Sequence, residues 1–111
     1  MLNYLIFILS LTVGSYTKEL ITNDILSIVK EIEPIVDKHL NDKGYNGLYP
    51  EEGTVEEVWS QIVNGVNYIA IKKFDNASLC IKFHQSIEKN LELETVKPCT
   101  SVFDVIIVRR K

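Results

Sequence analysis

From residue 54 onward, apolar and polar residues alternate in consecutive short stretches, and this pattern constrains the fold more than any other feature. Alternation predicts strands, because successive side chains of a strand point to opposite faces of a sheet. Turn-forming residues separate the stretches at residues 64–65, 75–76 and 88–90. The sequence therefore predicts antiparallel strands joined by hairpins. The alternating stretches are 66–71, 79–84 and 91–95, with Val55 and Trp59 expected on one side of an earlier strand and residues 102–108 expected to form or extend a last one.

A helical pattern precedes these strands. Apolar residues recur at helical spacing between residues 25 and 40, and Asn23 or Asp24 is expected to cap the first turn. Pro34 falls inside the pattern and is expected to kink the helix, because proline lacks the backbone donor. The glycine-containing residues 41–50 are expected to form a loop. The apolar stripe consists of Ile25, Ile28, Val29, Ile32, Ile35, Val36 and Leu40.

The order of these elements predicts an α+β domain in which one long helix packs across an antiparallel sheet. A chain of 111 residues fits a single domain. Its net charge of −3 and the lack of a large basic block argue against nucleic acid as a partner.

Nothing in the sequence favours catalysis. Cys80 and His84 share one face of a predicted strand, but four residues of strand would separate them by roughly 13 Å, too far for a nucleophile and its base. His39 and His84 are the only histidines, and neither has metal-ligand spacing around it. We therefore expect a protein that is not an enzyme and that uses no metal or cofactor.

The first residues resemble a secretory signal. Residues 4–13 are apolar, but the run is too short to span a membrane. We expect residues 1–15 to be a signal peptide and residues 16–111 to form the mature domain, secreted or endo-lysosomal and without a membrane segment. Cleavage after Ser15 or after Ser10 is compatible with the sequence, and a buried strand is the alternative interpretation.

Two further features suit the secretory route. The chain has two cysteines, Cys80 and Cys99, and an even number in a small secreted domain indicates a disulfide. Asn76 begins the sequon Asn-Ala-Ser and is a candidate for glycosylation.

One pentapeptide suggests a function. The sequence Gln-Ile-Val-Asn-Gly at residues 61–65, continued by Val66, Asn67 and Tyr68, resembles the Gln-x-Val-x-Gly hairpin of the cystatins, which inhibit papain-like cysteine proteases. A glycine at position 65 permits a positive φ in a tight turn. Apolar residues at such a tip are exposed unless a partner covers them. The residues expected to enter the protease cleft are Gln61, Ile62, Val63, Asn64 and Gly65.

Two other segments resemble the same family. Residues 28–36, including Pro34, are similar to the helix of the stefins, and Cys80 and Cys99 are spaced like the second disulfide of the secreted cystatins. The resemblance covers residues 23–99 and implies the cystatin fold, with one helix across a four- to five-stranded antiparallel sheet.

The resemblance also implies a mechanism: reversible, tight, non-covalent occupation of the protease cleft. Cystatins make two more contacts, a second hairpin tip and an N-terminal segment with a glycine. The second tip is expected at Ile87, Glu88, Lys89 and Asn90, where this chain lacks the Pro-Trp pair of secreted cystatins. Gly14 is expected at the N-terminal contact; the alternative is that it belongs to the signal cleavage region.

The resemblance leaves a second function open. A cystatin-like scaffold can also serve as a secreted binding module that inhibits no protease. The expected state is a monomer, with a strand-exchanged dimer as a further possibility. Replacement of Gly65 by Trp is expected to abolish inhibition and to leave the fold largely intact.

Overall fold

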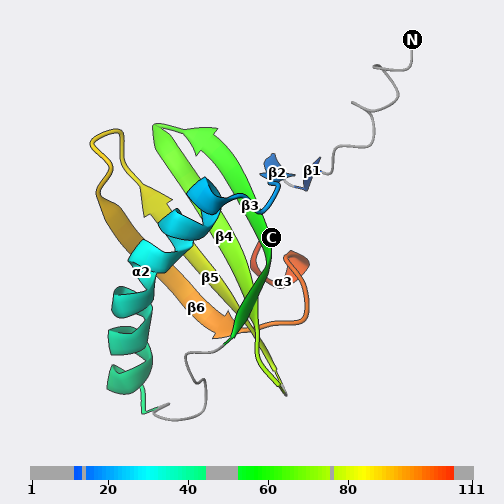
Figure 1. Cartoon of the computed structure of the whole chain (residues 1–111), viewed down its shortest axis with the longest axis vertical. Helices are drawn as coiled ribbons and strands as arrows, with labels where there is room; N and C mark the ends of the chain where they lie inside the picture. The colour runs from blue at the N-terminus through cyan, green and yellow to red at the C-terminus, as the bar shows by residue number, and fades with distance from the viewer. Residues whose placement is uncertain (1–11, 14, 45–52, 76, 107–111) are drawn as a thin grey trace, which may run out of the picture.

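One helix packs across an antiparallel sheet in the computed structural model, which describes residues 12–13, 15–44, 53–75 and 77–106 (Figure 1). The sheet has six strands in the order β1-β2-β3-β4-β5-β6. Four of them are long: β3 (Thr54–Val63), β4 (Gly65–Lys73), β5 (Ser78–Gln85) and β6 (Leu91–Pro98). The short strands β1 (Thr12–Val13) and β2 (Tyr16–Lys18) extend the sheet beyond β3. The α+β prediction is confirmed, and the two short strands extend the sheet beyond the expected number.

The helix α2 (Asn23–Asp42) follows the predicted stripe. Its cap is Thr22 rather than Asn23 or Asp24, because Thr22 has extended backbone angles and its hydroxyl accepts a 3.2 Å hydrogen bond from Ile25 N. The helix continues through Pro34. Its axis changes direction along its length in Figure 1, as expected where a backbone donor is missing. The helix also includes Asn41 and Asp42, which the sequence placed in a loop; residues 45–50 lie outside the described part.

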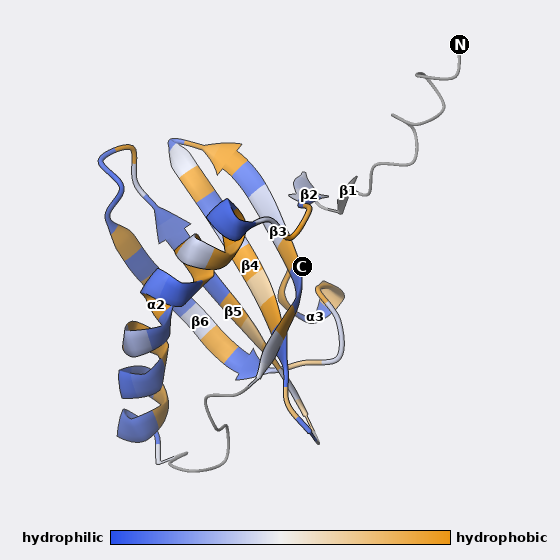
Figure 2. Cartoon of the chain, viewed as in Figure 1, coloured by the Kyte–Doolittle hydropathy of each residue, from blue (hydrophilic) through white to orange (hydrophobic). Residues whose placement is uncertain are grey.

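The main core lies between α2 and one face of the sheet, which we call the helix face. Figure 2 shows the apolar side of α2 turned toward this face. Tyr68 and Phe83 stack there with ring centroids 5.3 Å apart. Ile35 is exposed, so the buried stripe of the helix is narrower than predicted. The buried residues of this core are Val29, Ile32, Val36, Leu40, Val58, Tyr68, Ala70, Leu79, Ile81 and Phe83.

A second, smaller core lies on the opposite face of the sheet, which we call the outer face. It comprises the buried residues Tyr16, Trp59, Ile69, Ile71, Cys80 and Val102. The predicted disulfide between Cys80 and Cys99 is present, with 5.7 Å between the Cα atoms. Closing a loop of 19 residues stabilises the folded chain by roughly 3 kcal/mol. The bridge holds the C-terminal segment against the outer face.

The predicted strand at residues 102–108 is wrong where the structure describes it. Residues 103–106 form the short helix α3 (Phe103–Ile106). Its start is fixed by Asp104 Oδ2, which accepts hydrogen bonds from Thr100 N at 2.7 Å and Ser101 N at 3.4 Å. These bonds curl the chain into a turn, and Val102 becomes buried in the outer core. Residues 107 and 108 lie outside the described part.

Two β-bulges change the faces that simple alternation predicts. The register shifts between Val55 and Glu57, so Val55 packs on the helix face whereas Trp59 lies in the outer core. The prediction that these two share a side is therefore wrong. A second shift brings Val96 onto the helix face and pairs Thr95 with Lys82 of the outer face.

Several predictions concern residues outside the described part. They include residues 1–11 of the expected signal peptide, the N-terminal Gly14 and the sequon residue Asn76. Among the residues that the structure does describe, neither helix combines the length and apolar character needed to span a membrane.

Candidate functional site

The β3–β4 hairpin turns sharply at Asn64, between the paired residues Val63 and Gly65. Gly65 has a φ of +101°, as the sequence predicted. The side chain of Ile62 is 84% exposed and that of Val63 is 47% exposed. The hairpin therefore presents apolar side chains at an uncovered tip, and the residues that flank them in the sequence, Gln61 and Asn64, are uncharged.

Space as well as backbone angle requires glycine at position 65. A Cβ atom at this position would lie 2.4 Å from Gln85 O and 2.9 Å from His84 Nε2. The first of these is a backbone atom of β5 and cannot move without disturbing the sheet. The expectation that Gly65→Trp leaves the fold intact is therefore wrong, since any side chain here pushes β4 and β5 apart.

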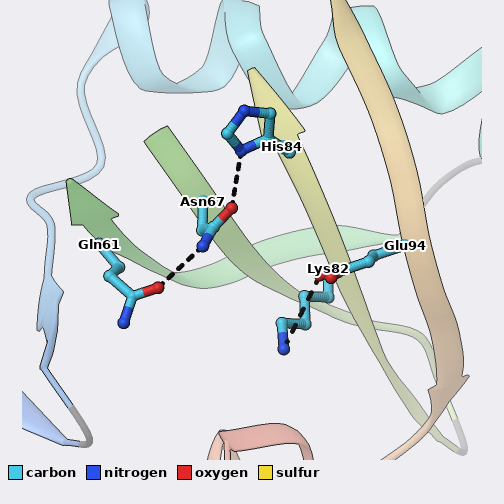
Figure 3. A network of polar contacts seen from close by, with 5 residues as sticks. All are labelled: Gln61, Asn67, Lys82, His84 and Glu94. Carbon is cyan, nitrogen blue, oxygen red and sulfur yellow. Dashed lines mark hydrogen bonds and ion pairs between the residues drawn. The ribbon is translucent and has the colours of Figure 1, made fainter. Parts of the chain in front are cut away.

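A row of polar side chains crosses the outer face directly behind the tip (Figure 3). Asn67 lies opposite Gln61 on β3 and opposite His84 on β5. Asn67 Nδ2 donates to Gln61 Oε1 at 2.8 Å, and Asn67 Oδ1 lies 2.7 Å from His84 Nδ1. We call Ser15, Gln61, Asn67 and His84 the polar ladder.

The ladder continues to the N-terminal segment. Gln61 Nε2 donates a 2.7 Å hydrogen bond to Ser15 Oγ, across 46 residues of sequence. Ser15 has a φ of +65°, which places it in a tight turn between β1 and β2. Gly14 is outside the described residues, but the neighbouring Ser15 brings this segment to the side of the hairpin.

The predicted second tip forms the turn between β5 and β6. Ser86 N donates to Asn90 O at 2.8 Å, and Lys89 N donates to Ser86 O at 2.8 Å. Lys89 takes a φ of +74° within this turn. Ile87 is 68% exposed, and Glu88, Lys89 and Asn90 are exposed as well. This tip therefore offers one apolar side chain among polar ones.

The topology brings the three segments to one end of the sheet. The β1–β2, β3–β4 and β5–β6 turns share that end because consecutive strands are antiparallel. Figure 1 shows the two long hairpin turns at the upper end of the sheet, with β1 and β2 beside β3. The described residues of the predicted site thus form one edge, although they come from distant parts of the sequence.

The core stiffens this edge from behind. Val66 packs against the main core, and Tyr68, two residues further along β4, is buried against Phe83. Burial raises the pKa of the Tyr68 phenol, and the Glu19 carboxylate raises it further, so this hydroxyl stays neutral. A rigid hairpin loses little conformational entropy when a partner covers it.

The described part of the chain offers few side chains for thiol chemistry or metal binding. Both cysteines are joined in the disulfide. The described residues contain no group of three or more His, Cys, Asp and Glu side chains placed to hold a metal ion. Buried side-chain nitrogen and oxygen atoms in this part all have hydrogen-bond partners.

Sequence reasoning missed three of the four ladder residues: Ser15, Asn67 and His84 were not predicted to belong to the site. The positions of the hairpin turns in the sequence were enough to find these residues. A turn that pairs Val63 with Gly65 also pairs Gln61 with Asn67, and the next hairpin pairs Asn67 with His84. Three polar residues in register on one face indicate a cross-strand row.

No family model and no curated protein matches this chain.

Proposed function

We propose that this protein is a cystatin-like, reversible inhibitor of papain-like cysteine proteases. One observation carries the proposal: the apolar, uncharged tip formed by Ile62 and Val63 projects from a hairpin whose turn is fixed by Gly65. The sequence of this hairpin resembles the inhibitory hairpin of the cystatins. The helix across an antiparallel sheet is compatible with the same family.

The tip suits a blocking role. Its exposed side chains gain roughly 1.5–3 kcal/mol each when they are buried in an apolar cleft. Because Val63 and Gly65 are paired on either side of the turn, the backbone is folded back rather than extended. A protease cleaves a chain that lies extended through its cleft, so a closed turn fills the groove without being a good substrate.

The other two segments add to the contact in unequal measure. Ile87 supplies one apolar side chain at the second tip, where Glu88 and Lys89 are polar. The segment at Ser15 lies beside the hairpin and is held to it by Gln61. The affinity is therefore expected to depend mainly on the first tip. A signal peptide cleaved after Ser10, which is the one of the two expected sites that leaves Ser15 in the mature chain, and delivery to a secreted or endo-lysosomal compartment belong to this proposal.

The second candidate function is a binding module with the same scaffold and no effect on proteases. The polar second tip favours it, because a weak side contact would limit the hold on a cleft. The uncovered Ile62 then binds another partner.

Steady-state kinetics with papain separate the two functions. The inhibitor is expected to compete with a peptide substrate, so that more substrate weakens the apparent inhibition. Intact mass measurement after incubation is expected to show an uncut chain and no covalent adduct. Unchanged papain activity at micromolar protein would reject inhibition and leave the binding module.

A further inference from the structure

We propose that Asn67 and His84 are positioning residues, which fix the orientation of Gln61 and through it hold the Ser15 segment against the hairpin. This inference rests on the proposed function only for its effect on a protease. The polar ladder itself is a property of the free protein.

The hydrogen bonds of the ladder all run in one direction. Gln61 Nε2 donates to Ser15 Oγ, so Gln61 Oε1 remains to accept from Asn67 Nδ2. Asn67 Oδ1 must then face His84, at 2.7 Å from Nδ1. A carbonyl oxygen can only accept, and His84 Nδ1 therefore carries the proton.

The direction of these hydrogen bonds fixes which nitrogen of the His84 imidazole carries the proton. Neutral His84 must be the Nδ1–H tautomer, with Nε2 directed toward the space above Gly65. Glu92 lies opposite His84 on β6, and Lys82, two residues before His84 on β5, pairs with Glu94 at 3.7 Å (Figure 3).

The ladder couples two of the predicted protease contacts. Gln61 belongs to the strand that carries the tip, and Ser15 belongs to the N-terminal segment. The backbone pairing of β2 with β3 also joins this segment to the strand, and the Gln61 amide, whose orientation depends on Asn67, adds the bond to Ser15. A change at His84 should therefore reach Ser15, although these two residues share no bond in the ladder.

Nitrogen NMR of the unmodified protein tests the direction of the hydrogen bonds in the polar ladder. The imidazole is observed in alkaline solution, at a pH where its nitrogen signals no longer change as the pH is raised. The proton is expected on Nδ1 of His84. A ring that carries its proton on Nε2 would overturn the proposal, and this result is independent of any protease.

A matched pair of variants tests the positioning. His84→Asn places an amide donor where Nδ1 lies, whereas His84→Leu has a similar size and no donor. The Gln61 side-chain amide protons are expected to exchange slowly in the original and Asn proteins and faster in the Leu protein. Equal exchange in all three would overturn the proposal.

Inhibition of papain then tests the coupling. His84→Leu and Ser15→Ala are each expected to lower the affinity for papain about tenfold. The loss of affinity in the double variant is expected to be smaller than the product of the two single losses. In an Asn67→Leu background, the two changes are expected to act independently. Independent effects in the original background would contradict the coupling. If the protein inhibits no protease, the proposed function fails and the two NMR measurements alone decide the inference.

Discussion

The imidazole of His84 lies over the position where Gly65 would carry a side chain, with Nε2 2.9 Å from the Cβ that glycine lacks. The turn thus requires glycine at position 65 for two reasons: the backbone has a φ of +101°, and there is no space for a side chain. Gly65→Ala should lower the free energy of unfolding by about 3 kcal/mol or more, since backbone strain adds to displacement of Gln85 O.

Gly44 provides the control for this comparison. It also has a positive φ, +84°, but among the described residues, its chain neighbours aside, no atom lies within 4 Å of the Cβ position. Gly44→Ala should therefore cost only the conformational part, about 1–2 kcal/mol. Urea unfolding measures both values, and equal losses for the two variants would show that the crowding at Gly65 is unimportant.

Polar substitution at the tip should separate stability from inhibition. Ile62→Ser removes an exposed side chain and should change the free energy of unfolding by less than about 0.5 kcal/mol. It should raise the inhibition constant for papain by about 10- to 100-fold, because burial in the cleft is lost. Ile35→Gln, on the exposed side of α2, is the matched control and should leave inhibition unchanged. Equal effects of the two substitutions would show that the tip has no special part in binding.

An ion pair joins the helix to the sheet on the helix face. Lys72 is 8% exposed, and its Nζ lies 2.9 Å from Glu33 Oε2 and 5.7 Å from the centre of the Phe74 ring. Glu33→Gln leaves this buried ammonium without its counter-charge and should lower the free energy of unfolding by about 1–3 kcal/mol. The exposed pair between Lys38 and Asp42 is the control, where Asp42→Asn should cost about 0.3–0.5 kcal/mol. A loss at Glu33 no larger than that at Asp42 would contradict the role of burial.

The C-terminal turn should open in acid. Hydrogen bonds from the backbone N–H groups of Thr100 and Ser101 hold the pKa of Asp104 below its ordinary value of 3.8. Because the folded pKa is lowered, the stabilisation is present above this value and is lost as the pH falls through the lowered pKa. The amide proton signal of Thr100 should therefore titrate with a midpoint below 3.8 and stay constant in Asp104→Asn. A midpoint at or above the ordinary value would contradict this arrangement.

Local patterns in the sequence predicted most of the fold. The helical spacing of Val29, Ile32, Val36 and Leu40 and the alternation along β4 and β5 follow directly from burial on one face. Gly65 was predicted to adopt a positive φ because its tight turn excludes other residues. These features depend on neighbours in sequence, and they are therefore visible without the structure.

Features that depend on distant partners could not be predicted in the same way. The bulge between Val55 and Glu57 adds a residue to β3 without a glycine or proline to mark it. The helix α3 replaces a strand because Asp104 captures backbone donors upstream and the disulfide holds the segment on the outer face. The contact of Ser15 with Gln61 joins residues far apart in the chain and requires knowledge of strand order.

Titration of papain with the purified protein tests the central claim most directly. With papain at about 10 nM and the protein increased from nanomolar to micromolar concentration, the tip is expected to abolish activity, and dilution is expected to restore it. With Ile62→Ser, loss of papain activity is expected to require a higher concentration of the protein. Papain that stays fully active at every concentration of the unaltered protein would contradict the account.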